Sequence, residues 1–481
     1  MKRRDFLKAV GLSAASLAMP GCRAQPERIE AEPVPEKKLN FVFIIIDDLG
    51  WRDIGLMGRA RGLGEPRVYY ETPNIDKLAG QGVVFASAYS NAPNCAPTRA
   101  CLMSGQYTPR HGVYTVGTSE RGKANMRKLI PTPNKTTLDS KVVTIAEALK
   151  PGGYTSACIG KWHLGTKEPF RQEDQGFDVV YARSRRSHFT TDGEYLTDRL
   201  TDEATKFIEA NKDRPFFLYL AHHAVHTPIQ AKKELIEKYK TKEPSGGHNN
   251  PAYAAMIESV DQSVGRVMDK LDELGLIENT VVFFFSDNGG HANMTSMAPL
   301  RGSKGMLYEG GIRVPMIVRW PGVARVRSVC DAPVIGIDFY PTILEMAGVP
   351  RPAGHVLDGM SIVPLLKGKG KFKRNAIFWH FPAYLEPYNE KQRPWRTTPA
   401  GAVRQWDWKL IEFFEDGKLE LYNLKKDIGE KDNLAEKMPD KAKELHQLLV
   451  DWRKSVDAPV PTERNPKYDP NAKRVKKRKR K

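Results

Sequence analysis

Residues 41–46 read FVFIII and are followed directly by two aspartates at 47–48. A second run of the same kind, VVFFF at 281–285, is followed by Ser-Asp-Asn at 286–288. Short, continuous apolar runs rich in aromatic and β-branched residues are typical of strands buried on both faces of a parallel sheet. The carboxyl ends of such strands share one edge of the sheet, so two ends far apart in sequence can meet there. The sequence therefore predicts an α/β fold with oxygen-bearing side chains converging at one sheet edge.

The rest of the chain extends this prediction. Residues 216–220 form a third apolar run, and helical patterns alternate with the runs at 142–150, 257–274 and 338–347. This order predicts a large mixed, mostly parallel sheet sandwiched by helices. From about residue 375 the pattern changes to short segments, IFWHF, WKLIEFF and KLELYNL, followed by a helical pattern at 440–456. These segments predict a smaller C-terminal antiparallel sheet with one packing helix.

Both ends of the chain differ in composition from its body. Residues 1–22 carry a twin-arginine start and a short apolar run, which is typical of an export signal. Residues 23–38 are rich in Pro and Glu and predict a linker, and residues 460–481 predict a basic, disordered tail. The main domain is then expected at 39–374 and a C-terminal subdomain at 375–459.

The export signal predicts a bacterial protein that works in the periplasm or at the cell surface. Gly21-Cys22 resembles a lipoprotein cleavage site, which predicts a lipid anchor on Cys22 at the outer membrane or cell surface; soluble periplasmic release is the alternative. The 481 residues carry a net charge of +18, but the last ten residues contribute +8 and the first ten +3. The body is only mildly basic, so no nucleic-acid partner is expected. Five cysteines without a C-x-x-C pair argue against a disulfide framework and a zinc site.

Asp47, Asp48, Asp287 and Asn288 offer three carboxylates and one amide oxygen. This hard donor set suits calcium or magnesium and does not suit zinc. Either acidic motif alone is equally consistent with a helix cap or a solvated turn.

A third motif is more specific. Residues 94–99 read NCAPTR and continue into the small, apolar helical pattern ACLMSG. This C-x-P-T-R segment resembles the signature of the type I sulfatases, which are formylglycine-dependent, arylsulfatase-like members of the alkaline phosphatase superfamily. GKWHLG at 160–165, VHTP at 225–228 and GSKG at 302–305 extend the resemblance in the family's order. It implies an alkaline phosphatase-like fold and a sulfatase domain at 39–374.

The resemblance also implies how the centre is built. In this family a formylglycine-generating enzyme oxidises the cysteine, here Cys95, to formylglycine (3-oxoalanine), whose hydrated diol attacks sulfur. One calcium ion would be bound by the four strand-end residues and by the modified Cys95. Chelation by hard oxygens would fit that ion better than a thiol.

Five further residues receive roles by the same resemblance. Arg99 would hold the modified group, and Lys161 and Lys304 would bind the sulfate oxygens. His226 would contact the sulfate and protonate the leaving alcohol. His163 would take a proton from the second hydroxyl so that sulfate is expelled.

The activity implied is sulfate ester hydrolysis on a sulfated polysaccharide or glycosaminoglycan. Two alternatives remain. The protein could hydrolyse phosphate or phosphonate monoesters, as other members of the superfamily do, or it could bind sulfated glycans without catalysing a reaction. Basic and aromatic residues that suit an acidic sugar occur in the segment 183–192 and near residue 380. The predicted substrate-binding residues are Arg185, Arg186, His188 and His380.

Overall fold

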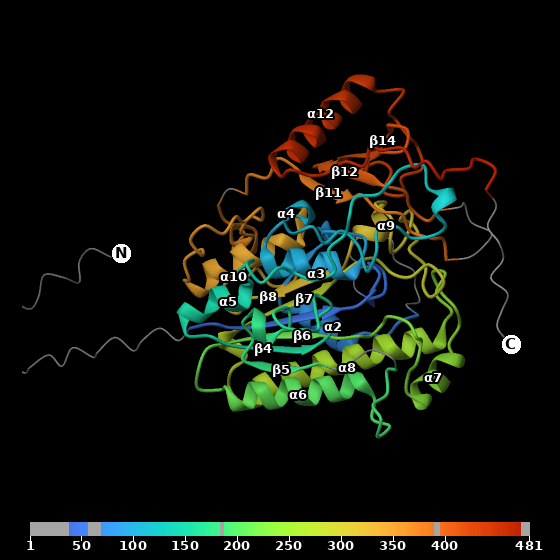
Figure 1. Ribbon diagram of the computed structural model, residues 1–481. Coiled ribbons are helices and arrows are strands. Elements are labelled where there is room, and N and C mark those ends of the chain that lie inside the picture. Colours follow the sequence, from blue (N-terminus) through green and yellow to red (C-terminus); the bar gives the residue numbers. More distant parts are fainter. Residues whose placement is uncertain (1–37, 56–68, 183–186, 371, 389–394, 473–481) are drawn as a thin grey trace, which may run out of the picture. The chain divides into compact units, whose positions relative to one another are not determined.

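The computed structural model describes residues 38–55, 69–182, 187–370, 372–388 and 395–472. An eight-stranded sheet lies at its centre (Figure 1). Strand β8 runs antiparallel to both of its neighbours, and the other neighbouring strands run parallel, which confirms the mixed, mostly parallel sheet. In sheet order the strands are β5 (Val179–Tyr181), β4 (Thr155–Gly160), β6 (Phe216–Ala221), β1 (Asn40–Ile46), β7 (Thr280–Ser286), β8 (Met316–Arg319), β2 (Val83–Phe85) and β9 (Ser328–Cys330).

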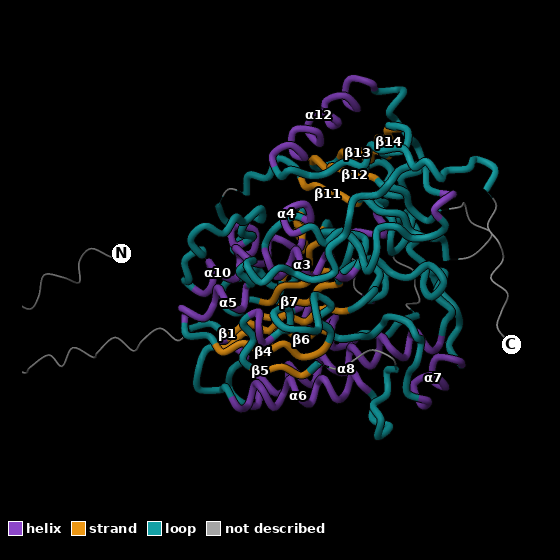
Figure 2. Tube along the Cα trace, viewed as in Figure 1, coloured by secondary structure: helices purple, strands orange, loops and turns teal. Residues whose placement is uncertain are grey.

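Helices cover both faces of this sheet (Figure 2). Alternate side chains of β1 point to opposite faces, so Val42 and Ile44 join one core cluster and Phe41 and Phe43 the other. Both faces are apolar because both are buried. The first face is covered by α2 (Pro73–Gly80), α6 (Leu196–Ala210) and α8 (Pro251–Glu273), with α7 (Lys233–Lys240) packed against α8. The second face is covered by α3 (Cys95–Ser104), α5 (Ile145–Leu149) and α10 (Phe339–Ala347).

Two helices differ from their predicted limits because of capping residues. The helix expected at 142–150 is α5, which begins only after Thr144; the Thr144 side chain and Glu147 form a capping box. The helix expected at 257–274 begins earlier, at Pro251, because Asn250 caps it by accepting from the Tyr253 amide. No helix among the described residues has the length and apolar character needed to cross a bilayer.

The C-terminal region forms an antiparallel sheet of four strands with α12 (Pro439–Ser455) against it (Figure 1). Three of its strands were predicted. The fourth, β12, was missed because its small residues, AGAVRQ, give little strand pattern. A third core cluster joins this sheet to the main domain, since Tyr89 and Ile312 belong to it together with Trp379. The strands are β11 (Ile377–Phe381), β12 (Ala400–Gln405), β13 (Trp408–Phe413) and β14 (Lys418–Asn423).

The chain after residue 459 corrects one prediction. The disordered tail expected from residue 460 is wrong for residues 460–472, because this stretch packs against residues 124–130. The Ile130 amide donates to the Glu463 carbonyl at 3.0 Å, and the Asn465 side chain donates to the carbonyls of Ala124 and Arg127 at 2.7 and 2.8 Å. The predicted basic segment from residue 473 lies outside the described residues, as do the export signal and Cys22.

Candidate active site

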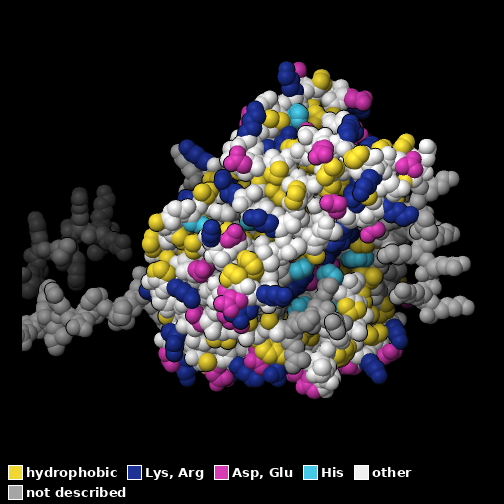
Figure 3. Space-filling model, viewed as in Figure 1, with side chains coloured by type: hydrophobic (Ala, Val, Ile, Leu, Met, Phe, Trp, Pro, Cys, Tyr) yellow, Lys and Arg dark blue, Asp and Glu magenta, His cyan; other side chains and the backbone are white. Residues whose placement is uncertain are grey.

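Most of the predicted metal and catalytic residues follow the carboxyl ends of four adjacent parallel strands, β4, β6, β1 and β7, and helix α3 and the loop before α9 (Glu309–Ile312) supply the others. Ile46 pairs with Ser286 in the register of β1 and β7, so Asp47 and Asp287 follow side by side. On the other side, the Lys161 amide donates to the Ala221 carbonyl of β6 at 2.8 Å. The sheet register therefore brings together motifs that are up to about 240 residues apart. On the face shown in Figure 3, histidine side chains gather with Lys or Arg side chains in a hollowed region.

Helix α3 places Cys95 at this edge. Cys95 is the first residue of the helix, so its thiol lies at the positive end of the helix dipole. The Thr98 hydroxyl donates to the Ala92 carbonyl and accepts from its amide, which fixes the turn before the helix. One turn further on, the fully buried Arg99 guanidinium contacts Asp287 at 2.8 Å and donates to the Lys161 carbonyl at 2.7 Å. The C-x-P-T-R segment thus places Cys95 and the Arg99 guanidinium on one helix.

Four oxygen-bearing side chains converge next to Cys95. Single ligand atoms of Asp47, Cys95 and Asp287 lie within 4.8 Å of one another. The Asn288 side-chain nitrogen donates to Asp48 at 2.9 Å, while the Asn288 side-chain oxygen, Oδ1, is buried without a hydrogen-bond partner among the described residues. A buried acceptor without a donor is costly unless something else satisfies it. The donor set and the open oxygen both fit a hard divalent cation.

Two lysines balance the carboxylates. The Lys161 ammonium lies 2.5 Å from Asp47, and the Lys304 ammonium 2.5 Å from Asp48. Burial by itself raises the pKa of Asp47, but the neighbouring cations, led by Lys161, outweigh it and hold that pKa well below its usual range. Burial raises the pKa of Asp287 to about 6, with a further contribution from the Asp47 carboxylate. The three acids are therefore close enough to repel one another, which is how a cation site behaves before the cation binds.

The two predicted catalytic histidines flank this group. His226 Nδ1 lies 2.8 Å from the Thr227 carbonyl, which assigns its hydrogen to Nδ1 and turns Nε2 toward Asp48 at 3.7 Å. Burial lowers the pKa of His226 to about 4 and that of His163 to about 2. His163 has φ 70°, the left-handed region that a residue other than glycine rarely adopts. Both imidazoles are thus neutral near pH 7 in the free site and able to accept a proton.

A family model described as Sulfatase matches residues 39–349, and one described as N-sulphoglucosamine sulphohydrolase, C-terminal, matches residues 303–455. This chain belongs to the sulfatase family. A protein named Sulfatase from Formosa agariphila is 35% identical over 88% of this chain and 90% of its own length. Mouse N-acetylgalactosamine-6-sulfatase is 32% identical over 71% of this chain and 68% of its own.

Solved structures agree with this assignment. The crystal structure of Ps i-CgsB is 27% identical to this sulfatase and superposes with a TM-score of 0.72, covering 86% of this chain and 93% of its own. The phosphonate monoester hydrolase of Agrobacterium radiobacter shares the fold, with a TM-score of 0.65, 20% identity and coverage of 87% and 96%. The chain is therefore a sulfatase with an alkaline phosphatase-like fold, as the resemblance implied.

Two of the four predicted substrate-binding residues, His188 and His380, are buried. The structure corrects the predicted substrate-binding role of His380. Its side chain is buried, lies 2.9 Å from the Pro459 carbonyl and packs near Tyr114, so it supports the C-terminal sheet. His188 is also fully buried, and its Nε2 lies 2.8 Å from the His226 carbonyl. It therefore supports the backbone at His226 and does not face a substrate. Alternating strand patterns cannot tell which polar residues point inward. Arg185 and Arg186 lie outside the described residues.

Three residues near the site were not singled out from the sequence as functional. Both ring nitrogens of His223 are buried without a hydrogen-bond partner among the described residues. Burial lowers the pKa of His223, and the nearby Lys161 ammonium lowers it further. Tyr388 donates to the Lys304 carbonyl at 3.0 Å, and Arg396 stacks on the Tyr388 ring at 3.9 Å. The last two lie in a loop of the C-terminal region, and no local pattern there indicates a site.

Proposed function

We propose that this sulfatase releases sulfate from a sulfated polysaccharide or glycosaminoglycan, using one calcium ion and a formylglycine made from Cys95 by a formylglycine-generating enzyme. The observation that carries the proposal is the convergence of Cys95, the oxygen donors and three cations in one buried group. Support for a sugar comes from relatives: one is named for N-acetylgalactosamine 6-sulfate, and Ps i-CgsB has a structure with k-i-k-neocarrahexaose.

The residues that would hold the metal are Asp47, Asp48, Asp287, Asn288 and the modified Cys95. When present, the hydrated formylglycine supplies the attacking hydroxyl and calcium lowers the pKa of that hydroxyl. An oxygen at position 95 suits this ion, whereas the thiol of the unmodified residue suits it poorly.

The chain's own cations would bind the sulfate group. Lys161 and Lys304 pair with Asp47 and Asp48, and they come from different parts of the chain, directly after β4 and from the loop before α9 (Glu309–Ile312). Both can donate to oxygens on which negative charge accumulates during transfer. Arg99 remains bound to Asp287 and fixes the nucleophile helix against β7.

The two histidines would move protons. A bound sulfate anion next to His226 raises the pKa of this imidazole from its low value in the free site, which is the condition for protonating a leaving alcohol. His163 is unprotonated in the free site, because burial lowers its pKa, so its ring nitrogen is available to take a proton in the second half of the reaction. His226→Ala should therefore reduce hydrolysis of a sugar sulfate more than that of nitrophenyl sulfate, whose leaving group needs no acid.

Two measurements test the nucleophile and the metal. The peptide that contains Cys95 should show the mass of an aldehyde in place of a thiol, and a fully active preparation with an intact thiol would contradict the proposal. Chelation should abolish activity, calcium should restore it, and Asp287→Ala should weaken metal binding. Stoichiometric zinc in the active enzyme would contradict an all-oxygen calcium site.

Comparison of two esters tests the choice of sulfate over phosphate. A sulfate monoester carries one negative charge and a phosphate monoester about two near neutrality, so the cations bind both. The proposal expects an aryl sulfate to be hydrolysed much faster than the matching aryl phosphate, because the formylglycine chemistry releases sulfate by elimination. Faster phosphate turnover would favour the phosphate or phosphonate monoesterase alternative.

Export to the periplasm or cell surface is also proposed, on the basis of the twin-arginine start at residues 1–22. Replacement of Arg3 and Arg4 by lysine should retain the protein in the cytoplasm of its bacterial host. Labelling with a palmitate analogue that depends on Cys22 would support a lipid anchor, and release of the protein with the soluble periplasmic fraction would support the alternative.

A further inference from the structure

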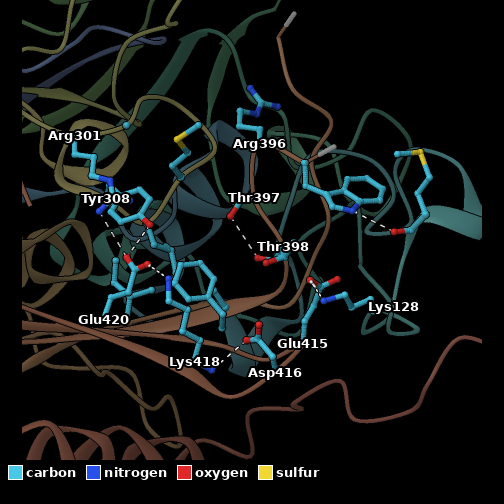
Figure 4. A pocket seen from close by; sticks show the side chains of 18 of the residues that line it. Lys128, Arg301, Tyr308, Arg396, Thr397, Thr398, Glu415, Asp416, Lys418 and Glu420 are labelled. Carbon is cyan, nitrogen blue, oxygen red and sulfur yellow. Dashed lines mark hydrogen bonds and ion pairs between the residues drawn. The ribbon is translucent and has the colours of Figure 1, made fainter. Parts of the chain in front are cut away.

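A cavity of about 770 Å³ lies between the C-terminal sheet and the loop that carries Lys304 (Figure 4). Arg301 and Met306 line it from that loop, while Lys304 sends its side chain to Asp48. Trp395 and Tyr308 add aromatic surface to the lining. A cavity of this size with aromatic and charged groups is suited to a sugar-sized ligand. Arg396 belongs to this lining and contacts the Lys304 carbonyl at 3.4 Å, so one wall of the cavity lies against the loop whose lysine reaches Asp48.

The charges in this cavity are unevenly matched. Lys128 pairs with Glu415 at 3.7 Å, and Lys418 pairs with Glu420 at 2.8 Å. Arg396 lies apart from these ion pairs (Figure 4) and forms none of its own among the described residues. Its Nη1 donates weakly to the Lys304 carbonyl at 3.4 Å, and its buried Nε has no hydrogen-bond partner among those residues. Arg396 is therefore the cation of this cavity that is left to meet an external anion.

Contacts with neighbouring residues hold the Arg396 side chain in its position. Its guanidinium stacks on Tyr388 at 3.9 Å, and the other neighbour of the Tyr388 ring is His291 at 4.0 Å, three residues after Asn288. Gly305 has φ 90°, and a Cβ there would lie 2.9 Å from Arg396 Nε, so the glycine leaves room for the side chain. Burial lowers the pKa of Arg396, and the nearby Arg121 guanidinium lowers it further. A stacked guanidinium that forms no ion pair among the described residues is a good receptor for a carboxylate or a sulfate.

We propose that Arg396 binds a second anionic group of the substrate, on the sugar next to the one that loses its sulfate, and that the cavity accepts that sugar. The inference rests on the proposed function, because it assumes a carbohydrate in the catalytic centre. The second anion is either a uronate carboxylate or another sulfate ester, and a guanidinium binds both through the same pair of N–H groups. The preferred substrate is then a polyanionic chain and not an isolated sulfated sugar.

Inhibition of nitrophenyl sulfate hydrolysis tests this. The probes are a chondroitin 6-sulfate hexasaccharide with its carboxyl-reduced counterpart, and a carrageenan hexasaccharide with its counterpart desulfated to a single ester. In the wild type, at least one polyanionic probe should have the lower inhibition constant of its pair. Arg396→Gln should raise that constant about tenfold and the counterpart's less than threefold, the loss expected for one charge-assisted contact. The pair that responds identifies the carboxylate or the sulfate.

Further variants distinguish binding of a second anion by Arg396 from a purely structural role in which Arg396 supports the Lys304 loop. Arg396→Lys keeps the charge and should restore part of the discrimination. Lys418→Gln removes a cation of the same cavity that is already paired, so it should change the ratio of inhibition constants less than twofold. If Arg396→Gln lowers kcat for nitrophenyl sulfate and leaves this ratio unchanged, or if neither pair is discriminated by the wild type, the inference is wrong. Absence of any sulfate ester hydrolysis would instead contradict the proposed function.

Discussion

Two groups of buried charges in this sulfatase have similar residues and different organisation. The catalytic cluster lies at the sheet edge and contains Cys95, Asp47, Asp48, Asp287, Asn288, Arg99, Lys161, Lys304 and His226. The structural cluster contains Tyr89, Glu309, Arg313, Lys409 and Glu430, and it joins the main domain to the C-terminal sheet.

The structural cluster is closed. Glu309 accepts from Tyr89 at 2.7 Å, from Arg313 at 2.9 Å and from Lys409 at 2.9 Å, and Lys409 also pairs with Glu430 at 2.9 Å. Although burial opposes it, this environment lowers the pKa of Glu309 to about 2. In the catalytic cluster, by contrast, the side-chain oxygen of Asn288 has no hydrogen-bond partner among the described residues. The ion pairs of the structural cluster hold two parts of the chain together, whereas the open oxygen of the catalytic cluster is what the proposed cation site requires.

The largest expected effect is on turnover, in the catalytic cluster. Cys95→Ala should reduce kcat by on the order of 10⁴-fold or more, because it removes the proposed nucleophile. The melting temperature should change little, since the contacts of the helix remain. Cys101→Ala is the matched control, as Cys101 is fully buried six residues later in the same helix. It should lower the melting temperature and retain activity; loss of turnover in both variants would show that disruption of the helix, and not the chemistry, is responsible.

The second effect is on stability and not on turnover, and it lies in the structural cluster. Lys409→Met leaves Glu309 and Glu430 buried beside each other without their shared cation, so the free energy of unfolding should fall by about 3–5 kcal/mol. Denaturant titration measures it. Lys418→Met, at a half-exposed lysine of the same sheet, should cost about 1 kcal/mol or less. Equal losses in the two variants would remove the distinction between closed and exposed charge pairs.

The third effect is a pH dependence. Burial raises the pKa of Glu430 from an ordinary 4.5 to about 7, with a further contribution from the Glu309 carboxylate. The folded chain therefore holds this proton more tightly than the unfolded chain, so the stabilising contribution is complete below about pH 4.5 and is lost as the pH rises to about 7. Between pH 5 and 8, Glu430→Gln should gain about 2 kcal/mol of stability relative to the wild type. Parallel stability curves would mean that Glu430 is ionised throughout.

The smallest effect tests the corrected position of His380. His380→Phe removes the hydrogen bond to the Pro459 carbonyl and should lower the free energy of unfolding by about 1 kcal/mol. The kcat/KM for a sulfate ester should stay within about twofold of the wild type, because the side chain is buried away from the catalytic cluster. A large rise in KM with unchanged stability would return His380 to the substrate site.

The sequence by itself determined the elements whose signals are local. Apolar runs at 41–46 and 281–285 predicted buried strands, and the acids directly after them were correctly expected to meet at one edge. The segment at 94–99 identified the family because its residues act within one helical turn and so keep a fixed spacing. These features depend on neighbours in sequence, which is why a pattern can reveal them.

Tertiary structure decided what depends on partners far along the chain. The pairing of Glu309 with Lys409 spans 100 residues, and the contact of Arg396 with Lys304 spans 92. Whether a polar side chain such as His380 faces solvent or the core is set by what packs against it, and no periodicity within its own strand records that. Charge compensation is likewise a property of three-dimensional distance, so only the folded chain distinguishes a lysine in a buried ion pair, such as Lys409, from a cation without one.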